Sequence, residues 1–126
     1  MILMLDKMRI RQILLNLISN AIKFSSMYDR VDVFVNCKVE NFETVNVQIK
    51  VVDYGIGISP KDMQNLFKPY FKTSDAKSKE MNVNSHGLGL NLCQKIAKSL
   101  NGKIEVHSVP REITIFTFSF DAQIST

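Results

Sequence analysis

The stretch that determines the fold lies close to the N-terminus, where residues 6–25 read DKMRIRQILLNLISNAIKFS. Its apolar residues recur three and four positions apart, which predicts an amphipathic helix with Asp6 as its N-cap. They cover roughly 200° of the helix circumference, because successive residues of a helix are about 100° apart. So wide an apolar surface predicts that other elements pack against this helix on more than one side.

A line of polar side chains follows the same helix. Its members lie within about 40° of one direction: Arg9, Gln12, Asn16, Asn20 and Lys23. Asparagine is unfavourable inside a helix, because its amide competes for backbone hydrogen bonds. Amide oxygens can coordinate a hard cation such as Mg²⁺, and an ammonium can contact a phosphate. The line is therefore either a solvated edge, as most such lines are, or a metal and phosphate site.

Local patterns predict the remaining elements. Alternating apolar residues indicate two antiparallel strands, and Ser59-Pro60 is typical of the start of a short helix that ends before Pro69. A polar loop, a second long helix that ends at Asn101-Gly102, and a final pair of strands follow. The expected strands cover residues 31–40, 45–51, 103–108 and 113–120, the loop covers 72–86, and the second long helix starts at 87–90. This order predicts a sheet with helices on one face.

Asp53 ends an apolar strand and is followed by Gly55 and Gly57. A carboxylate at this place can accept a hydrogen bond from the exocyclic amine of adenine, whereas guanine presents an oxygen at that edge. The glycines would allow the backbone to approach the base closely. The alternative is that Asp53 only caps the turn through backbone amides. The residues by themselves leave both interpretations open.

The start of the second long helix, Gly87-Leu88-Gly89-Leu90, is a candidate phosphate site. Free N–H groups and the positive end of the helix dipole face outward there, and glycine has no side chain to block a ligand. His86 can donate to a phosphate or simply face solvent. Phe67, Tyr70 and Phe71 are expected mainly to pack at the end of the short helix and to anchor the loop that follows.

Four of these stretches resemble, in order and spacing, the sequence boxes of the sensor histidine kinases. The matching residues are 6–25 for the N box, 53–59 (DYGIGIS) for the G1 box, 66–72 (LFKPYFK) for the F box and 87–90 (GLGL) for the end of the G2 box. These kinases share an ATPase superfamily with the DNA gyrase B subunit, MutL-type repair proteins and the 90-kDa heat-shock chaperones. The resemblance extends from Asp6 to Phe120.

The sequence departs from the family pattern at three places. Tyr70 stands where the F box has phenylalanine, and Ser85 stands where the G2 box has its first glycine. The Gly-x-Gly that usually precedes the last strand is absent, and residues 111–116 (REITIF) stand there instead. We therefore expect the turn before the last strand to differ in shape.

The resemblance implies an α+β fold: a two-layer sandwich of a mixed, mostly antiparallel sheet with helices on one face, the Bergerat-type ATP-binding fold, with its N-terminal strand truncated to residues 1–5. It implies ATP and Mg²⁺ as cofactors, with Asn20 and Asn16 as metal ligands. Asn16 and Lys23 are implied catalytic residues, and Lys23 contacts phosphate. The implied nucleotide-binding residues are Asn16, Asn20, Lys23, Asp53, Gly55, Gly57, Ile58, Phe67, His86, Gly87, Leu88, Gly89 and Leu90.

The implied function is transfer of the γ-phosphoryl group of ATP to a histidine on a separate helical dimerisation domain, in two-component phosphorelay signalling. Hydrolysis is expected to be weak, because ATP-hydrolysing relatives carry a glutamate base where this chain has Asn16. The histidines here, His86 and His107, are predicted in a loop and a strand. Residues 1–126 are therefore expected to be one catalytic domain, a fragment that needs an acceptor domain for activity.

The implied partners are that dimerisation domain and a downstream response-regulator receiver domain, in the same chain or another. An alternative is a catalytically degenerate nucleotide-binding module that controls partner docking. The net charge of +4 leaves a nucleic-acid-binding domain as a weaker alternative, and basic and aromatic residues show no stacking pattern on the predicted strands. No apolar run approaches the roughly 20 residues of a membrane span. We expect a cytoplasmic location, either free or as the cytoplasmic part of a membrane-attached sensor.

Overall fold

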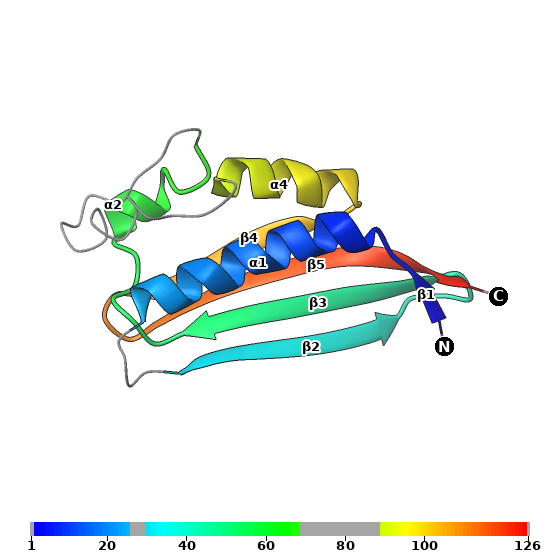
Figure 1. The fold of residues 1–126 in the computed structure, drawn as a ribbon, viewed down its shortest axis with the longest axis horizontal. Coiled ribbons are helices and arrows are strands. Elements are labelled where there is room, and N and C mark those ends of the chain that lie inside the picture. The colour runs from blue at the N-terminus through cyan, green and yellow to red at the C-terminus, as the bar shows by residue number, and fades with distance from the viewer. Residues whose placement is uncertain (1, 26–29, 69–88, 126) are drawn as a thin grey trace.

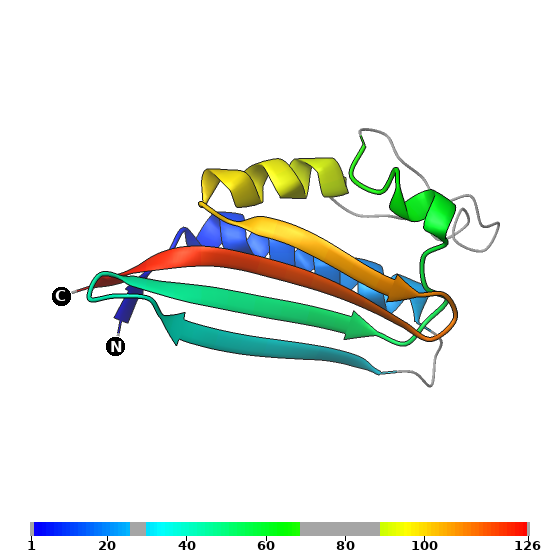
Figure 2. The same cartoon turned by 180° about the vertical axis from the view of Figure 1, so that it is seen from behind.

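The computed structural model describes residues 2–25, 30–68 and 89–125, and arranges them as a curved sheet with helices over one of its faces (Figure 1). The elements in chain order are β1 (Ile2–Met4), α1 (Lys7–Phe24), β2 (Val31–Val39), β3 (Thr44–Asp53), α2 (Pro60–Met63), α4 (Leu90–Ser99), β4 (Lys103–Val109) and β5 (Ile113–Ser125). The expected α+β sandwich with helices on one face is confirmed. Seen from behind, the sheet lies in front of α1 (Figure 2).

The sheet is built around the long strand β5. The strands follow the order β1-β5-β3-β2, and β4 pairs with β5 on the edge opposite to β3. All pairings among the described strands are antiparallel. The described strands thus form an antiparallel sheet, and the parallel pairing that the expected mixed sheet would contain is not found among them. After α4 the chain returns to the sheet as β4 and turns back into β5, and β5 lies between β4 and β3.

The core lies between the sheet and the helices. Alternate residues of β3 and β5 point into it, as the period of two predicts. The buried apolar side chains include Val45, Val47, Ile49 and Val51 of β3, Phe116, Phe118 and Phe120 of β5, Ile13, Leu17 and Ala21 of α1, and Cys93, Ile96 and Ala97 of α4. Burial of these side chains determines which face of each element is turned toward the core.

Helix α1 forms as predicted, with the Asp6 Oδ1 atom accepting from the backbone N–H of Arg9 at 3.1 Å. The helix packs against β3 on one side and α4 on another. Leu15 and Ile22 nevertheless remain 59% and 62% exposed. The prediction that this helix packs on more than one side is confirmed, although the described elements leave these two residues of the apolar arc exposed.

Strand β2 is the outermost strand, and its apolar alternation does not lead to burial. Val33, Val35 and Val39 share the helix-facing side with buried residues of β3, yet all three are exposed. The reason is the position of α1, which lies over β3 and leaves β2 largely uncovered (Figure 1).

The ends of the other helices follow the predicted local signals. The Ser59 Oγ atom accepts from the N–H of Asp62 at 3.2 Å, and Pro60 opens α2. At the end of α4, the N–H of Gly102 donates to the Ala97 carbonyl at 2.9 Å, and Asn101 takes the left-handed backbone conformation with φ 56°. A Cβ on Gly102 would lie 2.2 Å from the Ser119 carbonyl oxygen, so this glycine lets α4 end directly against β5.

Residues 2–4 of the expected short N-terminal strand form β1, which pairs with the C-terminal end of β5. Tyr70, Phe71 and the loop expected at residues 72–86 lie outside the described residues. Among the described helices, none has both the length and the apolar character that a membrane span requires.

Candidate functional site

The candidate site residues gather at one end of the molecule. The C-terminal half of α1, the last residue of β3, the start of α4 and the short helix α2 all lie at the left of Figure 1. The polar residues along α1 fall into an exposed group and a covered group. Arg9 and Gln12 are exposed, as a solvated edge would be, whereas Asn16 is buried and Asn20 is half-buried.

The two asparagines form a hydrogen-bonded pair, called here the amide pair (Asn16 and Asn20). The Asn20 Nδ2 atom donates to the Asn16 Oδ1 atom at 3.2 Å. The Asn16 Nδ2 atom donates in turn to the sulfur of Cys93 on α4 at 3.1 Å. Burial raises the pKa of the Cys93 thiol to about 11, so the thiol is protonated at neutral pH. The amide pair is therefore held between two helices.

Lys23 lies almost two turns beyond Asn16 on α1 and carries a covered ammonium. Its Nζ atom has no hydrogen-bond partner among residues 2–25, 30–68 and 89–125. Burial lowers the pKa of Lys23, because a low-dielectric environment disfavours the charged form. A covered ammonium beside neutral amides is a favourable place for an anion.

A second polar group lies on the sheet and is called here the polar row (Asp53, Thr114 and Ser108). Asp53 pairs with Thr114 across β3 and β5, and Thr114 pairs with Ser108 across β5 and β4. Asp53 and Thr114 are 4% and 3% exposed. The Ser108 Oγ and Thr114 Oγ1 atoms lie 2.7 Å apart, and Ser108 Oγ also accepts from the N–H of Ile58 at 2.9 Å.

Asp53 does cap its turn, as the second interpretation of the sequence proposed. Its Oδ1 atom accepts from the N–H of Gly55 at 3.1 Å. A carboxylate offers about four lone-pair sites on its two oxygens, so this hydrogen bond leaves accepting capacity for a ligand. Turn capping and adenine recognition are thus compatible in this geometry.

Gly57 is required by the fold rather than only by a ligand. Its φ is 75°, and a Cβ there would lie 2.7 Å from the Cα atom of Pro110. The turn between β4 and β5 therefore packs on the loop after β3. The N–H of Arg111 also donates to the Ile56 carbonyl at 2.9 Å. Arg111 itself has a φ of 63°, which shows how this turn accommodates the missing Gly-x-Gly.

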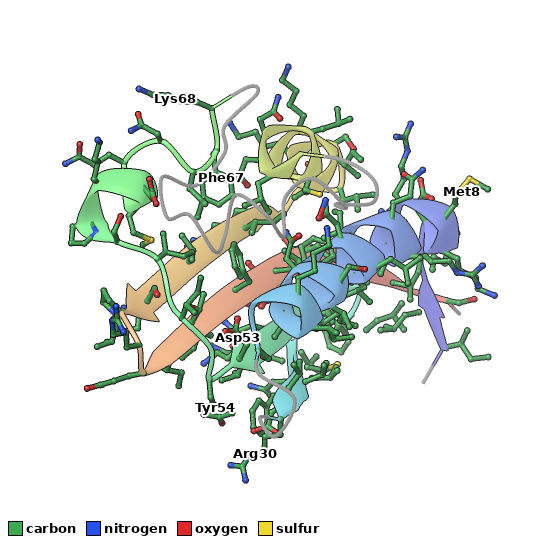
Figure 3. The ribbon with its side chains drawn as sticks, turned by 60° about the vertical axis from the view of Figure 1, so that its left-hand side comes forward. Met8, Arg30, Asp53, Tyr54, Phe67 and Lys68 are labelled. Carbon is green, nitrogen blue, oxygen red and sulfur yellow. The ribbon has the colours of Figure 1, made fainter. Side chains whose placement is uncertain are left out.

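Tyr54 and Arg30 hold the other side of the same loop. The Tyr54 hydroxyl donates to an Asp32 Oδ2 atom at 2.8 Å, and the Arg30 Nε atom donates to the same oxygen at 3.1 Å. The guanidinium lies 5.2 Å from the centre of the tyrosine ring. In Figure 3 both side chains extend away from the helices, below Asp53. This cluster fixes the residue that follows Asp53 to strand β2.

The remaining implied nucleotide residues divide into three groups. Ile58, Phe67 and Leu90 are half-buried and pack against the core, which favours the packing interpretation for Phe67. Phe67 points inward whereas Lys68 points into solvent (Figure 3). Gly89 is exposed and is the N-cap of α4, and no side chain of the described residues caps it, so within that part of the chain the helix terminus can accept an anion. His86, Gly87 and Leu88 lie outside the described residues.

The sequence interpretation did not find Thr114, Ser108 or the polar role of Cys93. Thr114 lies on the same face of β5 as Phe116, Phe118 and Phe120. A polar residue among these apolar alternate positions is a signal that the sequence contains. Cys93 follows the helical spacing of the apolar residues of α4, and this spacing does not indicate a polar contact. Its contact with Asn16 joins residues 77 positions apart, so no local pattern signals it.

Comparison with known proteins agrees with this geometry. Residues 5–124 match the family described as histidine kinase-, DNA gyrase B- and HSP90-like ATPases. The chain belongs to this family. Within it, the chain is a catalytic ATPase domain of the sensor histidine kinase type, as its relatives indicate.

The relatives are much longer proteins. The chain is 32% identical over 120 residues to the signal transduction histidine-protein kinase BarA of Escherichia coli (strain K12), covering 95% of this chain and 13% of BarA. It is 34% identical over 114 residues to the adaptive-response sensory kinase SasA of Rippkaea orientalis, covering 90% of this chain and 27% of SasA. The ATPase domain thus spans about an eighth to a quarter of these relatives.

Solved structures of histidine kinases share the fold. Full-length ShkA in complex with AMPPNP superposes with a TM-score of 0.71 at 24% identity, over 98% of this chain and 24% of ShkA. The Acinetobacter baumannii histidine kinase AdeS superposes with a TM-score of 0.60 at 30% identity, over 91% of this chain and 46% of that one. The domain is accordingly an ATP-binding domain of the two-component sensor class.

Proposed function

We propose that this domain binds ATP together with Mg²⁺ and transfers the γ-phosphoryl group to a histidine on a separate helical dimerisation domain. The observation that carries the proposal is the covered Nζ atom of Lys23, which has no hydrogen-bond partner within the described part of the chain. It follows the amide pair on α1, at the same end of the molecule as the end of β3 with Asp53. Such an arrangement supports a ligand with a polar base at one end and a multiply charged group at the other.

The polar row recognises the base in this proposal. Asp53 accepts a hydrogen bond from the exocyclic amine of adenine, and its negative charge disfavours guanine, which presents an acceptor there. Thr114 lies directly across from Asp53 and supplies a hydroxyl beside the same edge. Because both residues are buried at the end of paired strands, their geometry exists before the nucleotide binds.

The helices bind the charged end of the nucleotide. Lys23 contacts a phosphate oxygen, and the open N-terminus of α4 at Gly89 adds backbone donors and the positive end of its dipole. The amides of Asn16 and Asn20 have the hard oxygen atoms that Mg²⁺ prefers, so the residues present fit the metal. When bound, Mg²⁺ neutralises charge on the phosphates during phosphoryl transfer.

The residues also predict what the domain does not do well. An amide cannot take a proton from water, so Asn16 cannot serve as a general base. His107 lies on strand β4 and is exposed, which is not the helical setting of an acceptor histidine. The acceptor is therefore proposed to come from the dimerisation domain, which then passes the phosphoryl group to a response-regulator receiver domain, in the same chain or another. We place this reaction in the cytoplasm, where ATP is available.

Calorimetric titration of the purified domain tests the nucleotide site. We expect ATP to bind in the presence of Mg²⁺ and Asp53→Asn to weaken binding by about 10- to 100-fold, because a hydrogen bond to a charged group contributes about 1.5–3 kcal/mol. Asp121→Asn, an exposed carboxylate on β5, is the matched control and should bind ATP normally. No binding at high ATP, or equal binding by Asp53→Asn, would contradict the proposal.

A phosphorylation assay tests the transfer step separately. The domain is mixed with a histidine-bearing dimerisation domain of a related sensor kinase and labelled ATP, and acid-labile label on the partner is measured. We expect label on the partner and little phosphate release without it. ATP binding without transfer to any such partner would instead indicate a nucleotide-binding module.

A further inference from the structure

A chain of side-chain hydrogen bonds runs from the interior to the proposed metal side of the site. It begins at the sulfur of Cys93, which is fully buried on α4, and passes through Asn16 to Asn20 on α1. Both steps use the Nδ2 end of an amide as the donor, at 3.1 and 3.2 Å. Each hydrogen bond of the series therefore points from donor to acceptor toward the core, where the last acceptor, the Cys93 sulfur, lies.

The donor-to-acceptor direction of these hydrogen bonds determines which side-chain atom Asn20 presents to the proposed metal. Because its Nδ2 atom is used toward Asn16, the amide plane of Asn20 directs its Oδ1 atom to the other side. An amide oxygen is a ligand for Mg²⁺, and an amide NH₂ group is not. If both amides were reversed, Asn20 would present a donor to the metal instead of an acceptor.

We propose that Cys93 is a positioning residue, whose sulfur accepts from Asn16 and so fixes the orientation of both amides with the oxygen of Asn20 toward the metal. This inference rests on the proposed function, since it assigns Asn20 to the metal. Sulfur is a weak acceptor, yet it is the core-side partner that this chain of bonds uses. An apolar side chain at residue 93 removes this acceptor and so weakens the preference for this amide orientation over the reversed one.

The test compares Cys93→Val with Cys93→Ser. Valine has a similar volume and no acceptor, whereas serine keeps an acceptor at the same place. The readout is the gain in ATP affinity that magnesium produces, taken as the ratio of the calorimetric Kd in EDTA to the Kd in saturating Mg²⁺. Residues that orient a metal ligand typically change metal affinity by about 10- to 100-fold.

We expect Cys93→Val to reduce the gain in ATP affinity from magnesium by about 3- to 10-fold. This is less than the loss of a residue that itself hydrogen-bonds a metal ligand typically produces. The Kd in EDTA should stay close to the wild-type value. Cys93→Ser should recover most of the gain. Ile96→Val is the matched control, because Ile96 is buried on the same helix and shortening it loosens the core without removing an acceptor from Asn16. Its magnesium gain should equal that of the wild type.

The outcomes separate this inference from the proposed function. If the wild-type domain shows no magnesium gain, the metal site fails and the inference fails with it. If the wild type shows the gain and Cys93→Val keeps it, or if Cys93→Ser loses as much as Cys93→Val, only the role of Cys93 is overturned. Equal losses in EDTA and in Mg²⁺ indicate a packing role and also overturn it.

A spectroscopic measurement covers the case in which Cys93→Val does not fold. In wild-type protein labelled with ¹⁵N-asparagine, the side-chain NH₂ protons of Asn16 should exchange with solvent far more slowly than those of the exposed Asn101. Their chemical shifts should move in Cys93→Ser, because oxygen replaces the sulfur acceptor. Unchanged Asn16 resonances in Cys93→Ser would overturn the inference.

Discussion

The polar row on the sheet and the amide pair on the helices face the same end of the molecule but are held in different ways. Asp53, Thr114 and Ser108 occupy neighbouring strands, so the ladder of backbone hydrogen bonds fixes their spacing. Asn16 and Asn20 depend on side-chain hydrogen bonds, one within α1 and one from α1 to α4, and Lys23 beyond them has no hydrogen-bond partner among the described residues. The polar row is formed before a ligand binds, whereas the helix side contains a charge that residues 2–25, 30–68 and 89–125 leave without a hydrogen-bond partner.

This difference indicates how the two sides would share the work of binding. A preformed row can discriminate between bases, because its donors and acceptors do not move to fit a wrong ligand. An unpartnered ammonium gives affinity for an anion at a cost to the stability of the free protein. Changes on the sheet side should therefore lower both the stability of the fold and the affinity for the nucleotide. Removal of the Lys23 charge should raise the stability and lower the affinity.

The largest effect is expected from Gly57→Ala. The new Cβ would meet the backbone of Pro110 at 2.7 Å, and alanine would have to adopt a φ of 75°. We expect a loss of about 2–3 kcal/mol in the free energy of unfolding, equivalent to roughly 10 °C in Tm for a domain of this size. Thermal unfolding followed by circular dichroism measures it.

Gly57→Ala also tests whether the polar row contributes to ATP binding independently of the amide pair and the metal. Displacement of the loop after Asp53 should weaken ATP binding equally with and without magnesium, because the change lies on the sheet side. A stable Gly57→Ala protein with normal ATP affinity would show that the β4–β5 turn does not position the polar row.

An intermediate effect is expected from Lys23→Met, which keeps most of the apolar stem and removes the charge. ATP binding should weaken about tenfold, since a charge-assisted hydrogen bond is lost. The free protein should become more stable, because the change removes a covered ammonium for which the described residues provide no hydrogen-bond partner. Loss of both stability and affinity would contradict the proposed contrast between the two sides.

The pH dependence of stability gives a second test of Lys23. Its pKa is lowered by burial, so the folded protein releases this proton at lower pH than the unfolded chain does. Wild-type stability should therefore rise as pH increases from the lowered pKa toward the ordinary value near 10.4. The stability advantage of Lys23→Met should be full below this interval and should shrink through it, as denaturant titrations of both proteins at several pH values would show.

The smallest effect is expected from Arg111→Gly. Arginine holds a φ of 63° in the turn that packs on Gly57, and glycine adopts this conformation without a Cβ penalty. We expect a stabilisation of about 0.5 kcal/mol after the entropy cost of glycine is subtracted. Glu112→Gly, one residue later, should only destabilise, and urea titration of both variants distinguishes them.

Much of the fold follows from local chemistry that the sequence displays. Asp6, Ser59 and the Asn101-Gly102 pair act as the helix caps that their types predict, because capping involves residues a few positions apart. The alternation along residues 45–51 likewise predicts the face that is buried in β3. The exposure of β2 and of Leu15 could not be predicted in this way, since it depends on which elements pack against them.

The sequence by itself determined the elements, their order and the amides, carboxylate and glycines that make the chain resemble an ATP-binding domain. Only the tertiary structure decided how those residues are used. It placed Thr114 beside Asp53, filled the space at Gly57 with Pro110, and joined Asn16 to Cys93 across two helices. The physical reason is distance along the chain, because a contact between residues separated by 50 or more positions depends on the packing of whole elements and leaves no periodic trace in the sequence.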